Sequence, residues 1–317
     1  MTTKGGTSQA KAEADGGIGG WLGRLRLGES WREGSLEVVP LVLDGGDGAP
    51  GLLLTRQAVE AGVLEIVERG EGVVQELLAW NKGDRLVVIL EGDTLVGCKQ
   101  NRVVAHSVVV APGTRLAVPV GCMERGRWHH ETGRFSVGDM KMSPRVRQRT
   151  VADVKEATLS GSRPTVDQSR LWRDVDTELA CCGVSSPTSD YYEIVERQGR
   201  EARDRARAFV PAPSQVGVLV LSGGVLLGFE AAGHHGLWSE LSAPTLASYM
   251  MGYSRGHEQA RRERASAGEW LARVQSARLA STPGLGLGHD LDLQGPGLSG
   301  VGLAIDGEPV HVAVFPA

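Results

Sequence analysis

The sequence predicts an α+β fold, because short β-rich runs fill its first part, helical periodicity its middle and strand pairs its end. The chain has 317 residues, of which 41% are hydrophobic and 23% are charged, which is typical of a soluble globular protein. We expect an N-terminal antiparallel β-sandwich-like unit, then central helices, and finally C-terminal β-hairpins with helices packed on the sheet.

Residues 1–34 are rich in Gly, Ala, Ser and Lys, and we predict that they form a disordered tail. Within this tail, residues 18–27 (IGGWLGRLRL) carry several apolar side chains. This segment is a candidate docking site for a protein partner. The alternative is that Trp21 and its neighbours pack back onto the globular part of the chain.

Residues 35–317 are expected to form a single domain that begins with a β-rich part at 35–128. About seven apolar runs of strand length follow one another there, at 36–43, 51–55, 63–68, 73–80, 85–90, 102–110 and 114–120. The turn residues at 70–72 and 81–84 are typical of hairpins, and Ala-Pro-Gly at 111–113 joins the last two runs. Consecutive strands without helices between them favour antiparallel sheets packed as a sandwich or an open barrel.

Residues 144–210 form the helical part of the predicted domain. Leu171, Val175 and Leu179 recur at every fourth position, which is the spacing of one helix face. The two prolines in Pro211-Ala-Pro213 end this part, because proline has no amide hydrogen to donate.

Residues 214–317 form the last, α/β part. The apolar runs 215–221 and 225–231 flank Gly223-Gly224 and predict a hairpin. We expect helices over 245–253 and 257–280. Three strands should follow, at 284–293, 298–306 and 309–315, with turns at 294–297 and 306–307.

Charge and hydropathy exclude several classes of protein. The net charge of −4 leaves no excess of cations to coat a nucleic acid. No run reaches the roughly 18–20 apolar residues that a membrane helix requires. The four cysteines include no CxxC pair, which favours a reducing compartment, and acidic residues stand where a secretory signal would begin. We therefore expect a cytoplasmic protein.

Several catalytic signatures are missing from the sequence, namely the P-loop, HExxH and GxSxG motifs. The pairs His129-His130 and His234-His235 invite a metal interpretation. However, adjacent side chains on an extended strand point to opposite faces, so each pair offers one metal only one ligand easily. We predict no metal site. The sequence identifies no cofactor, no catalytic residue and no oligomeric state.

Two polar segments each accompany an apolar strand: EGDTLVGCKQNR at 91–102 and VPVGCMERGRW at 118–128. Arginine binds phosphate or carboxylate through two parallel hydrogen bonds, side-chain amides read a ring or ribose edge, and an indole stacks on a planar base. We therefore predict a pocket for a nucleotide-like or anionic metabolite, in which the KQNR segment contacts the ERGRW segment. Its residues are Glu91, Asp93, Lys99, Gln100, Asn101, Arg102, Glu124, Arg127 and Trp128.

A second interpretation of the same residues needs no ligand. Gln100, Asn101 and Arg102 would satisfy backbone groups at a β-corner and pair with Glu91 or Glu124. Cys122 raises the further question of a nucleophile, because neighbouring arginines lower a thiol pKa. A nearby glutamate raises it, however, and no histidine partner is assured, so we favour a non-catalytic Cys122. Whether the protein is an enzyme stays open.

The segment EGDTLVGCKQNRVVAHSVVV, followed by LAVPVGCMERGRW, resembles the ARG-and-rhodanese-phosphatase-superfamily-associated protein domain family, a little-studied prokaryotic family. QVGVLVLSGGVLLGFEAAG with LASYM resembles the second conserved region of that family, and GLSGVGLAIDGEPVHVAVF resembles its C-terminal strand pair. The resemblance covers about residues 36–317. The chain departs from the family pattern at Cys98, Gly121, Met123 and Arg125.

The resemblance implies a link to ADP-ribose, because genes of this family neighbour those of ADP-ribose-processing proteins and of prokaryotic conflict or stress systems. It transfers no established reaction. We expect a cytoplasmic bacterial domain that binds or processes a nucleotide-derived small molecule, related to ADP-ribose, in a stress or conflict system. The alternative is a non-catalytic scaffold or adaptor that docks onto a larger assembly through its N-terminal tail.

Overall fold

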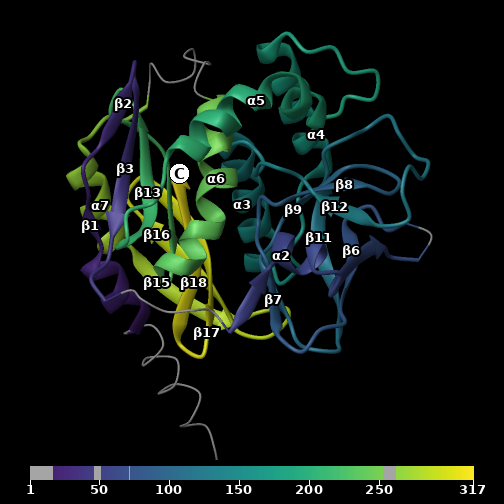
Figure 1. Cartoon of the computed structure of the whole chain (residues 1–317), viewed down its shortest axis with the longest axis horizontal. Helices are drawn as coiled ribbons and strands as arrows, with labels where there is room; N and C mark the ends of the chain where they lie inside the picture. The colour runs from purple at the N-terminus through teal and green to yellow at the C-terminus, as the bar shows by residue number, and fades with distance from the viewer. Residues whose placement is uncertain (1–16, 46–50, 71, 253–261) are drawn as a thin grey trace, which may run out of the picture. The chain divides into compact units, whose positions relative to one another are not determined.

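The computed structural model describes residues 17–45, 51–70, 72–252 and 262–317 (Figure 1). Its helices and its sheets, which are antiparallel except for one pair of strands, confirm the predicted α+β class. The chain divides into two compact units, where a single domain was expected. Of the described residues, 17–45, 210–242 and 262–317 belong to unit 1, and 51–70, 72–209 and 243–252 belong to unit 2.

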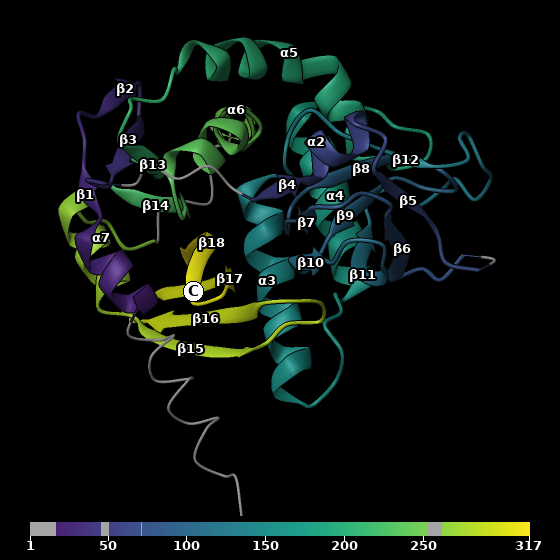
Figure 2. The same ribbon diagram turned by 60° about the horizontal axis from the view of Figure 1, so that its bottom comes forward.

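Unit 1 contains a nine-stranded antiparallel sheet, of which Figure 2 shows β15, β16 and β17 side by side. In spatial order the strands are β1 (Arg26–Leu27), β3 (Leu36–Val42), β13 (Gln215–Ser222), β14 (Val225–Ala232), β18 (Glu308–Pro316), β17 (Leu298–Ile305), β16 (His289–Gly295) and β15 (Arg278–Pro283), with β2 (Trp31–Glu33) paired to β3. The pairing of β3 with β13 joins the N-terminal segment to the C-terminal half of the chain.

The predicted turns of unit 1 are confirmed by the pairing of β13 with β14, β16 with β17, and β17 with β18. The predicted helix over 257–280 is wrong at both of its described ends, because residues 262–266 are not helical and helix α7 (Ala267–Gln275) stops before β15 begins. The part of that prediction at 257–261 lies outside the described residues. Ser266 starts α7 by accepting a hydrogen bond from the Glu269 amide.

The predicted disordered tail is wrong for residues 17–34. Residues 17–24 are helical, and β1 and β2 follow. The apolar residues Ile18, Trp21, Leu22 and Leu25 occupy one helical face at i, i+3, i+4 and i+7, and all are buried in the core of unit 1. Burial of this face offsets the entropy of ordering the segment. These side chains are therefore not available to a partner, and residues 1–16 lie outside the described part of the chain.

Unit 2 contains two sheets whose side chains share one core. The six-stranded sheet has the order β12 (Phe135–Val137), β8 (Thr94–Gly97), β9 (Arg102–Val104), β11 (Arg115–Cys122), β6 (Glu76–Asn81) and β5 (Leu64–Glu68). The three-stranded sheet has the order β10 (Val108–Val110), β7 (Leu86–Ile89) and β4 (Leu52–Leu54), in which β4 and β7 are parallel. The short helix α2 (Thr55–Glu60) contributes Ala58 to the same core.

Local sequence patterns predicted where the strands of unit 2 lie in the chain better than they predicted which strands pair with one another. The hairpin predicted around 70–72 is confirmed by the pairing of β5 with β6, and residue 71 of its turn lies outside the described residues. The hairpin turn at 81–84 is wrong, because β6 and β7 belong to different sheets. The predicted strand 102–110 is divided into β9 and β10, which also lie in different sheets. Helix α2 and strands β8 and β12 were not expected.

The central helices are α3 (Pro144–Leu159), α4 (Gln168–Cys182) and α5 (Tyr192–Ala208), and α6 (His235–Gly252) begins before its predicted start at Thr245. Helix α4 packs closely on β11, because a Cβ atom on Gly121 would collide with Leu171. In the described part of the chain, no helix is both long enough and apolar enough to cross a membrane.

Replacing Trp21 by alanine tests whether the N-terminal helix belongs to the core. Trp21 is 3% exposed, so its loss should lower the free energy of unfolding by about 3–5 kcal/mol. Leu159→Ala is the control, because Leu159 is 87% exposed and should change stability by no more than about 0.5 kcal/mol. Urea denaturation measures both. A W21A variant as stable as the parent protein would show that the helix does not contribute to folding.

Candidate functional site

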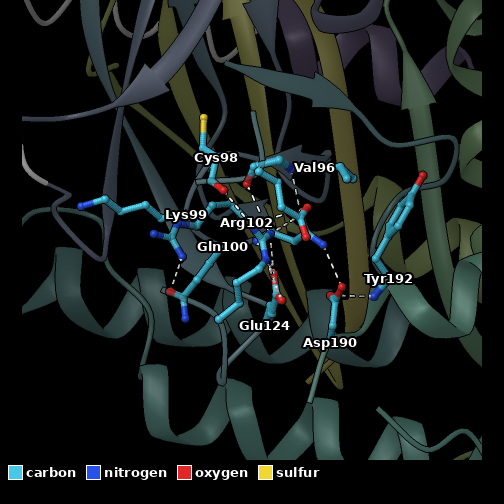
Figure 3. Close-up of polar contacts among 12 residues, drawn as sticks. Val96, Cys98, Lys99, Gln100, Arg102, Glu124, Asp190 and Tyr192 are labelled. Carbon is cyan, nitrogen blue, oxygen red and sulfur yellow. Dashed lines mark hydrogen bonds and ion pairs between the residues drawn. The ribbon is translucent and has the colours of Figure 1, made fainter. Parts of the chain in front are cut away.

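The two polar segments predicted from the sequence lie together in unit 2. Strand β9 pairs with the end of β11, so that Arg102 lies opposite Cys122. The side-chain amide of Gln100 donates to the Arg125 carbonyl (3.1 Å), and the backbone amide of Asn101 donates to Glu124 Oε2 (3.1 Å). The predicted contact between the KQNR and ERGRW segments is therefore confirmed. Figure 3 shows the side chains of Gln100, Arg102 and Glu124 gathered at this point.

The turn between β8 and β9 has a backbone that suits few residues. Gly97 has φ +120° and Cys98 has φ +46°. A Cβ atom on Gly97 would collide with the Thr132 hydroxyl, which accepts a hydrogen bond from the Cys98 amide (2.9 Å). Only glycine combines this left-handed conformation with so close a neighbour. The turn is thereby held where its polar residues meet the end of β11.

Arg127 and Glu124 form a buried ion pair at the centre of this region. Arg127 Nε lies 2.9 Å from Glu124 Oε1, and Nη2 lies 2.6 Å from Oε2. Arg127 also donates to the Cys98 carbonyl (2.6 Å) and to Asn101 Oδ1 (3.3 Å). Burial alone would lower the pKa of Arg127, but its hydrogen bonds to Glu124 and the charge of that residue raise the pKa above its ordinary value. Arg127 and Glu124 thus hold the two segments together.

Asp190, in the connection from α4 to α5, completes this buried network. Its carboxylate accepts from Asn101 Nδ2 (2.8 Å) and from the Tyr192 amide (3.0 Å). Figure 3 shows Asp190 beside Tyr192. Burial raises the pKa of Asp190 to about 7, the charge of Glu124 contributes, and these two hydrogen bonds oppose the shift. No sequence pattern predicts this role for Asp190, because a polar residue in a Ser- and Thr-rich connection is typical of an ordinary turn.

Arg102 is fully buried and differs from Arg127 in its hydrogen bonds. Its Nη1 donates to Gln100 Oε1 (2.8 Å) and to Cys122 Sγ (2.7 Å). Its Nη2 lies 3.7 Å from Glu68 Oε2, which is an ion-pair distance but not a hydrogen bond. Arg102 Nε and Nη2 and Glu68 Oε2 are buried without a hydrogen bond to any described residue. The ion-pair partner of Arg102 is therefore Glu68, where the interpretation without a ligand expected Glu91 or Glu124.

Trp128 lies at the surface beside Arg102 and is 48% exposed. Lys99 Nζ is 5.3 Å from the centre of its ring, and Arg102 Cζ is 5.9 Å from it. A Cβ atom on Gly72 would touch both Lys99 and Trp128, so the turn after β5 lies against them. We call this region the Trp128 site, and define it by Trp128, Lys99, Gln100, Arg102 and Glu68.

Glu91 and Asp93 belong to a different cluster, so the prediction that they line the same pocket as the KQNR and ERGRW segments is wrong. Arg147 of α3 binds both carboxylate oxygens of Glu91, with Nε 3.0 Å from Oε2. Lys141 Nζ lies 3.0 Å from the Glu91 carbonyl and 3.0 Å from Asp93 Oδ1, and Thr55 Oγ1 donates to Asp93 Oδ2 (2.6 Å). Glu91 and Asp93 precede β8 whereas the KQNR segment follows it, so they lie at its two ends.

The two buried cysteines near the Trp128 site are not poised as nucleophiles. Burial raises the pKa of Cys122 to about 11, although Arg102 opposes the shift. Burial also raises the pKa of Cys98 to about 11, and the charge of Glu68 adds to the effect. Both groups are therefore thiols rather than thiolates at neutral pH.

His234 and His235 of unit 1 do not lie on an extended strand, because His235 begins helix α6. His234 Nδ1 accepts from the Leu237 amide (3.3 Å), and His235 Nδ1 lies 3.0 Å from the Gln215 carbonyl. An unpredicted pair lies on β14 and β18, where His311 Nε2 is 2.9 Å from Glu230 Oε2 and both residues are buried. The sequence feature that indicates this pair is a single titratable residue within each of two apolar strands, Glu230 in β14 and His311 in β18. A carboxylate that hydrogen-bonds one imidazole nitrogen fixes the orientation and tautomer of the ring.

These observations define an α+β protein with an exposed, cation-flanked tryptophan beside a buried arginine. The family described as ARG and Rhodanese-Phosphatase-superfamily-associated Protein domain matches residues 24–315, and the chain therefore belongs to this family. The resemblance drawn from the KQNR and ERGRW segments is thereby confirmed. No curated protein and no solved structure matches the chain.

The raised pKa of Asp190 predicts a specific dependence of stability on pH. Between the ordinary aspartate pKa of about 4 and about 7, folded Asp190 retains a proton that the unfolded chain has lost. The free energy of unfolding should therefore fall as the pH rises through this range, by up to about 1.4 kcal/mol per pH unit. Asp190→Asn abolishes this contribution, so the stability of D190N relative to the parent should increase from pH 4 to pH 7.

Urea denaturation at several pH values measures this difference. The hydrogen bond that D190N loses gives only a constant offset, because an amide does not titrate in this range. Asp306→Asn, in an exposed turn of unit 1, is the matched control and should retain the pH profile of the parent. Parallel profiles for D190N and the parent would contradict the raised pKa.

Thiol labelling tests the protonation and burial of Cys122. Iodoacetamide at neutral pH should alkylate the exposed Cys181 and leave Cys122 unmodified until the protein is unfolded, because Cys122 is buried as a thiol. Mass spectrometry of tryptic peptides distinguishes the two sites, and Cys181 is the internal control. Labelling of Cys122 in the folded protein at a rate similar to that of Cys181 would restore it as a candidate nucleophile.

Proposed function

We propose that this protein binds a nucleotide-derived small molecule at the Trp128 site. The observation that carries the proposal is the exposed Trp128 indole beside Lys99 and the incompletely hydrogen-bonded guanidinium of Arg102. An exposed indole offers a stacking surface for a base, and the two cations attract phosphate groups. Val73 and Val74, which are both exposed on the adjoining turn, extend the apolar surface for the same ligand.

The spacing of these groups favours a ligand that carries its charge close to a planar ring. Lys99 and Arg102 lie 5.3 and 5.9 Å from the ring of Trp128. A phosphate between these cations would therefore be near a base stacked on the indole. A short linker such as ribose joins the two groups at this separation, and nucleoside phosphates have this construction.

ADP-ribose and its relatives are the nucleotide derivatives that we propose. They combine an adenine ring, ribose and phosphate, and the family resembled by the KQNR and ERGRW segments is linked by gene neighbourhood to ADP-ribose processing. We propose a role in a bacterial stress or conflict system on the same basis. Binding is proposed in preference to covalent catalysis because the pKa values of about 11 keep the nearby thiols protonated.

The alternative role as a scaffold that docks through residues 18–27 has less support. That hypothesis required exposed apolar side chains in the N-terminal segment. Ile18, Trp21, Leu22 and Leu25 are instead buried in the core of unit 1. A partner that bound them would first have to remove the segment from that core.

Isothermal titration calorimetry with ADP-ribose, NAD and AMP tests the proposal. At least one of these ligands should bind, and Trp128→Ala should weaken that binding by about 5- to 150-fold, since stacking on an aromatic side chain contributes about 1–3 kcal/mol. Trp80→Ala is a matched control, because Trp80 also lies beside two cations, Lys82 at 4.4 Å and Arg115 at 4.3 Å.

The control should bind as the parent does, because Trp80 lies outside the Trp128 site. Thermal unfolding of both variants without ligand would verify that they are folded. Failure of all three nucleotides to bind the parent, or equal binding by W128A and the parent, would contradict the proposed function.

A further inference from the structure

Glu68 is the residue of the Trp128 site that neither the sequence motif nor the proposed stacking explains. It ends strand β5, and its side chain is 5% exposed. One carboxylate oxygen, Oε1, accepts a hydrogen bond from the Lys99 amide (3.2 Å). The other, Oε2, faces Arg102 Nη2 at 3.7 Å without a hydrogen bond. Glu68 is thus held by the turn between β8 and β9 and lies just too far from the guanidinium for a close ion pair.

Arg102 presents one complete edge of its guanidinium toward the Glu68 carboxylate. Its Nη1 is held by Gln100 and Cys122, so the plane of the group is fixed. Its Nε and Nη2 are the two nitrogens that lack a hydrogen bond to any described residue. These nitrogens form the side of a guanidinium that binds two oxygens of one phosphate or carboxylate through parallel hydrogen bonds. The Glu68 carboxylate occupies the approach to this edge without making either bond.

We propose that the phosphate of the bound nucleotide displaces the Glu68 carboxylate from Arg102 and bonds to Arg102 Nε and Nη2. This inference rests on the proposed function and names the group that the site recognises and the residue that competes with it. Displacement exchanges a long ion pair for two charge-assisted hydrogen bonds, and it satisfies buried donors that otherwise cost free energy. Glu68 therefore sets the affinity of the site for the anion.

The position of Trp128 is consistent with such an exchange. Its ring lies 5.9 Å from Arg102 Cζ and is 48% exposed, so it forms the outer side of the site above the arginine. A phosphate bound to Arg102 would be close to the indole, and the base attached to that phosphate would lie next to the ring. Binding at Arg102 and stacking on Trp128 are therefore coupled in one ligand.

Glu68→Gln separates the competing charge from the hydrogen bond that Glu68 makes. Glutamine keeps an oxygen that accepts from the Lys99 amide, and it removes the negative charge from Arg102. The affinity for AMP should rise at least about tenfold in E68Q, because the phosphate no longer competes with a carboxylate for the guanidinium. The affinity for adenosine, which has no phosphate, should stay within about twofold of that of the parent.

Two further variants, a control and a second test of the site, are measured by the same calorimetry. Glu76→Gln is the matched control, because Glu76 lies on the neighbouring strand β6, is not a residue of the Trp128 site, and pairs with Arg69 and, at 3.2 Å, with Arg163. It should leave AMP affinity unchanged and so exclude an effect of net charge alone. Arg102→Lys removes the two-nitrogen edge and should weaken AMP at least about tenfold while adenosine is little affected. This variant tests the assignment independently of how well E68Q folds.

The results separate this inference from the proposed function. If AMP binds the parent and neither E68Q nor R102K changes its affinity, or if adenosine changes as much as AMP, the inference is overturned and the proposed function stands. If AMP, NAD and ADP-ribose bind neither the parent nor E68Q, both are overturned. A gain for AMP in E68Q that is absent for adenosine and in E76Q supports the displacement of Glu68.

Discussion

The buried ion pair between Glu124 and Arg127 is the interaction on which the candidate site depends. Arg127 donates to the Cys98 carbonyl and to the side-chain oxygen of Asn101, and Glu124 accepts from the backbone amide of Asn101. Lys99 follows Cys98 directly and Trp128 follows Arg127 directly, so this pair fixes the two residues that flank the proposed ligand. Removing one partner would leave a buried charge uncompensated, which is strongly destabilising.

Two buried arginines in the same region have different roles because their hydrogen bonds differ. Arg127 faces carboxylate and carbonyl oxygens at hydrogen-bond distance, and its contacts join the turn after β8 to the segment after β11. Arg102 has hydrogen bonds on one side only, and its other edge faces a carboxylate at ion-pair distance. Completed hydrogen bonding is typical of a structural residue, whereas a buried group without it calls for an explanation. The proposed function assigns that explanation to a ligand.

The sequence predicted the centre of this site and missed its surroundings for a physical reason. Polar residues at the ends of apolar strands indicated that Asn101 and Glu124 would meet, and the pairing of β9 with β11 brings them together. Asp190 and Glu68 reach the site through contacts distant in sequence, which no local pattern encodes. Glu91 is close to the KQNR segment in sequence but not in space, because β8 separates it from the turn. In the fold, likewise, the strand runs were visible but the pairing of β3 with β13 was not.

A crystal structure of the protein grown with AMP tests the central claim most directly, because it locates the phosphate and the base together. The account predicts phosphate oxygens on Nε and Nη2 of Arg102, the adenine ring against the indole of Trp128, and the Glu68 carboxylate turned away from the guanidinium. AMP bound elsewhere on the protein, or a phosphate on Lys99 alone with Glu68 still facing Arg102 at an unchanged distance, would contradict it.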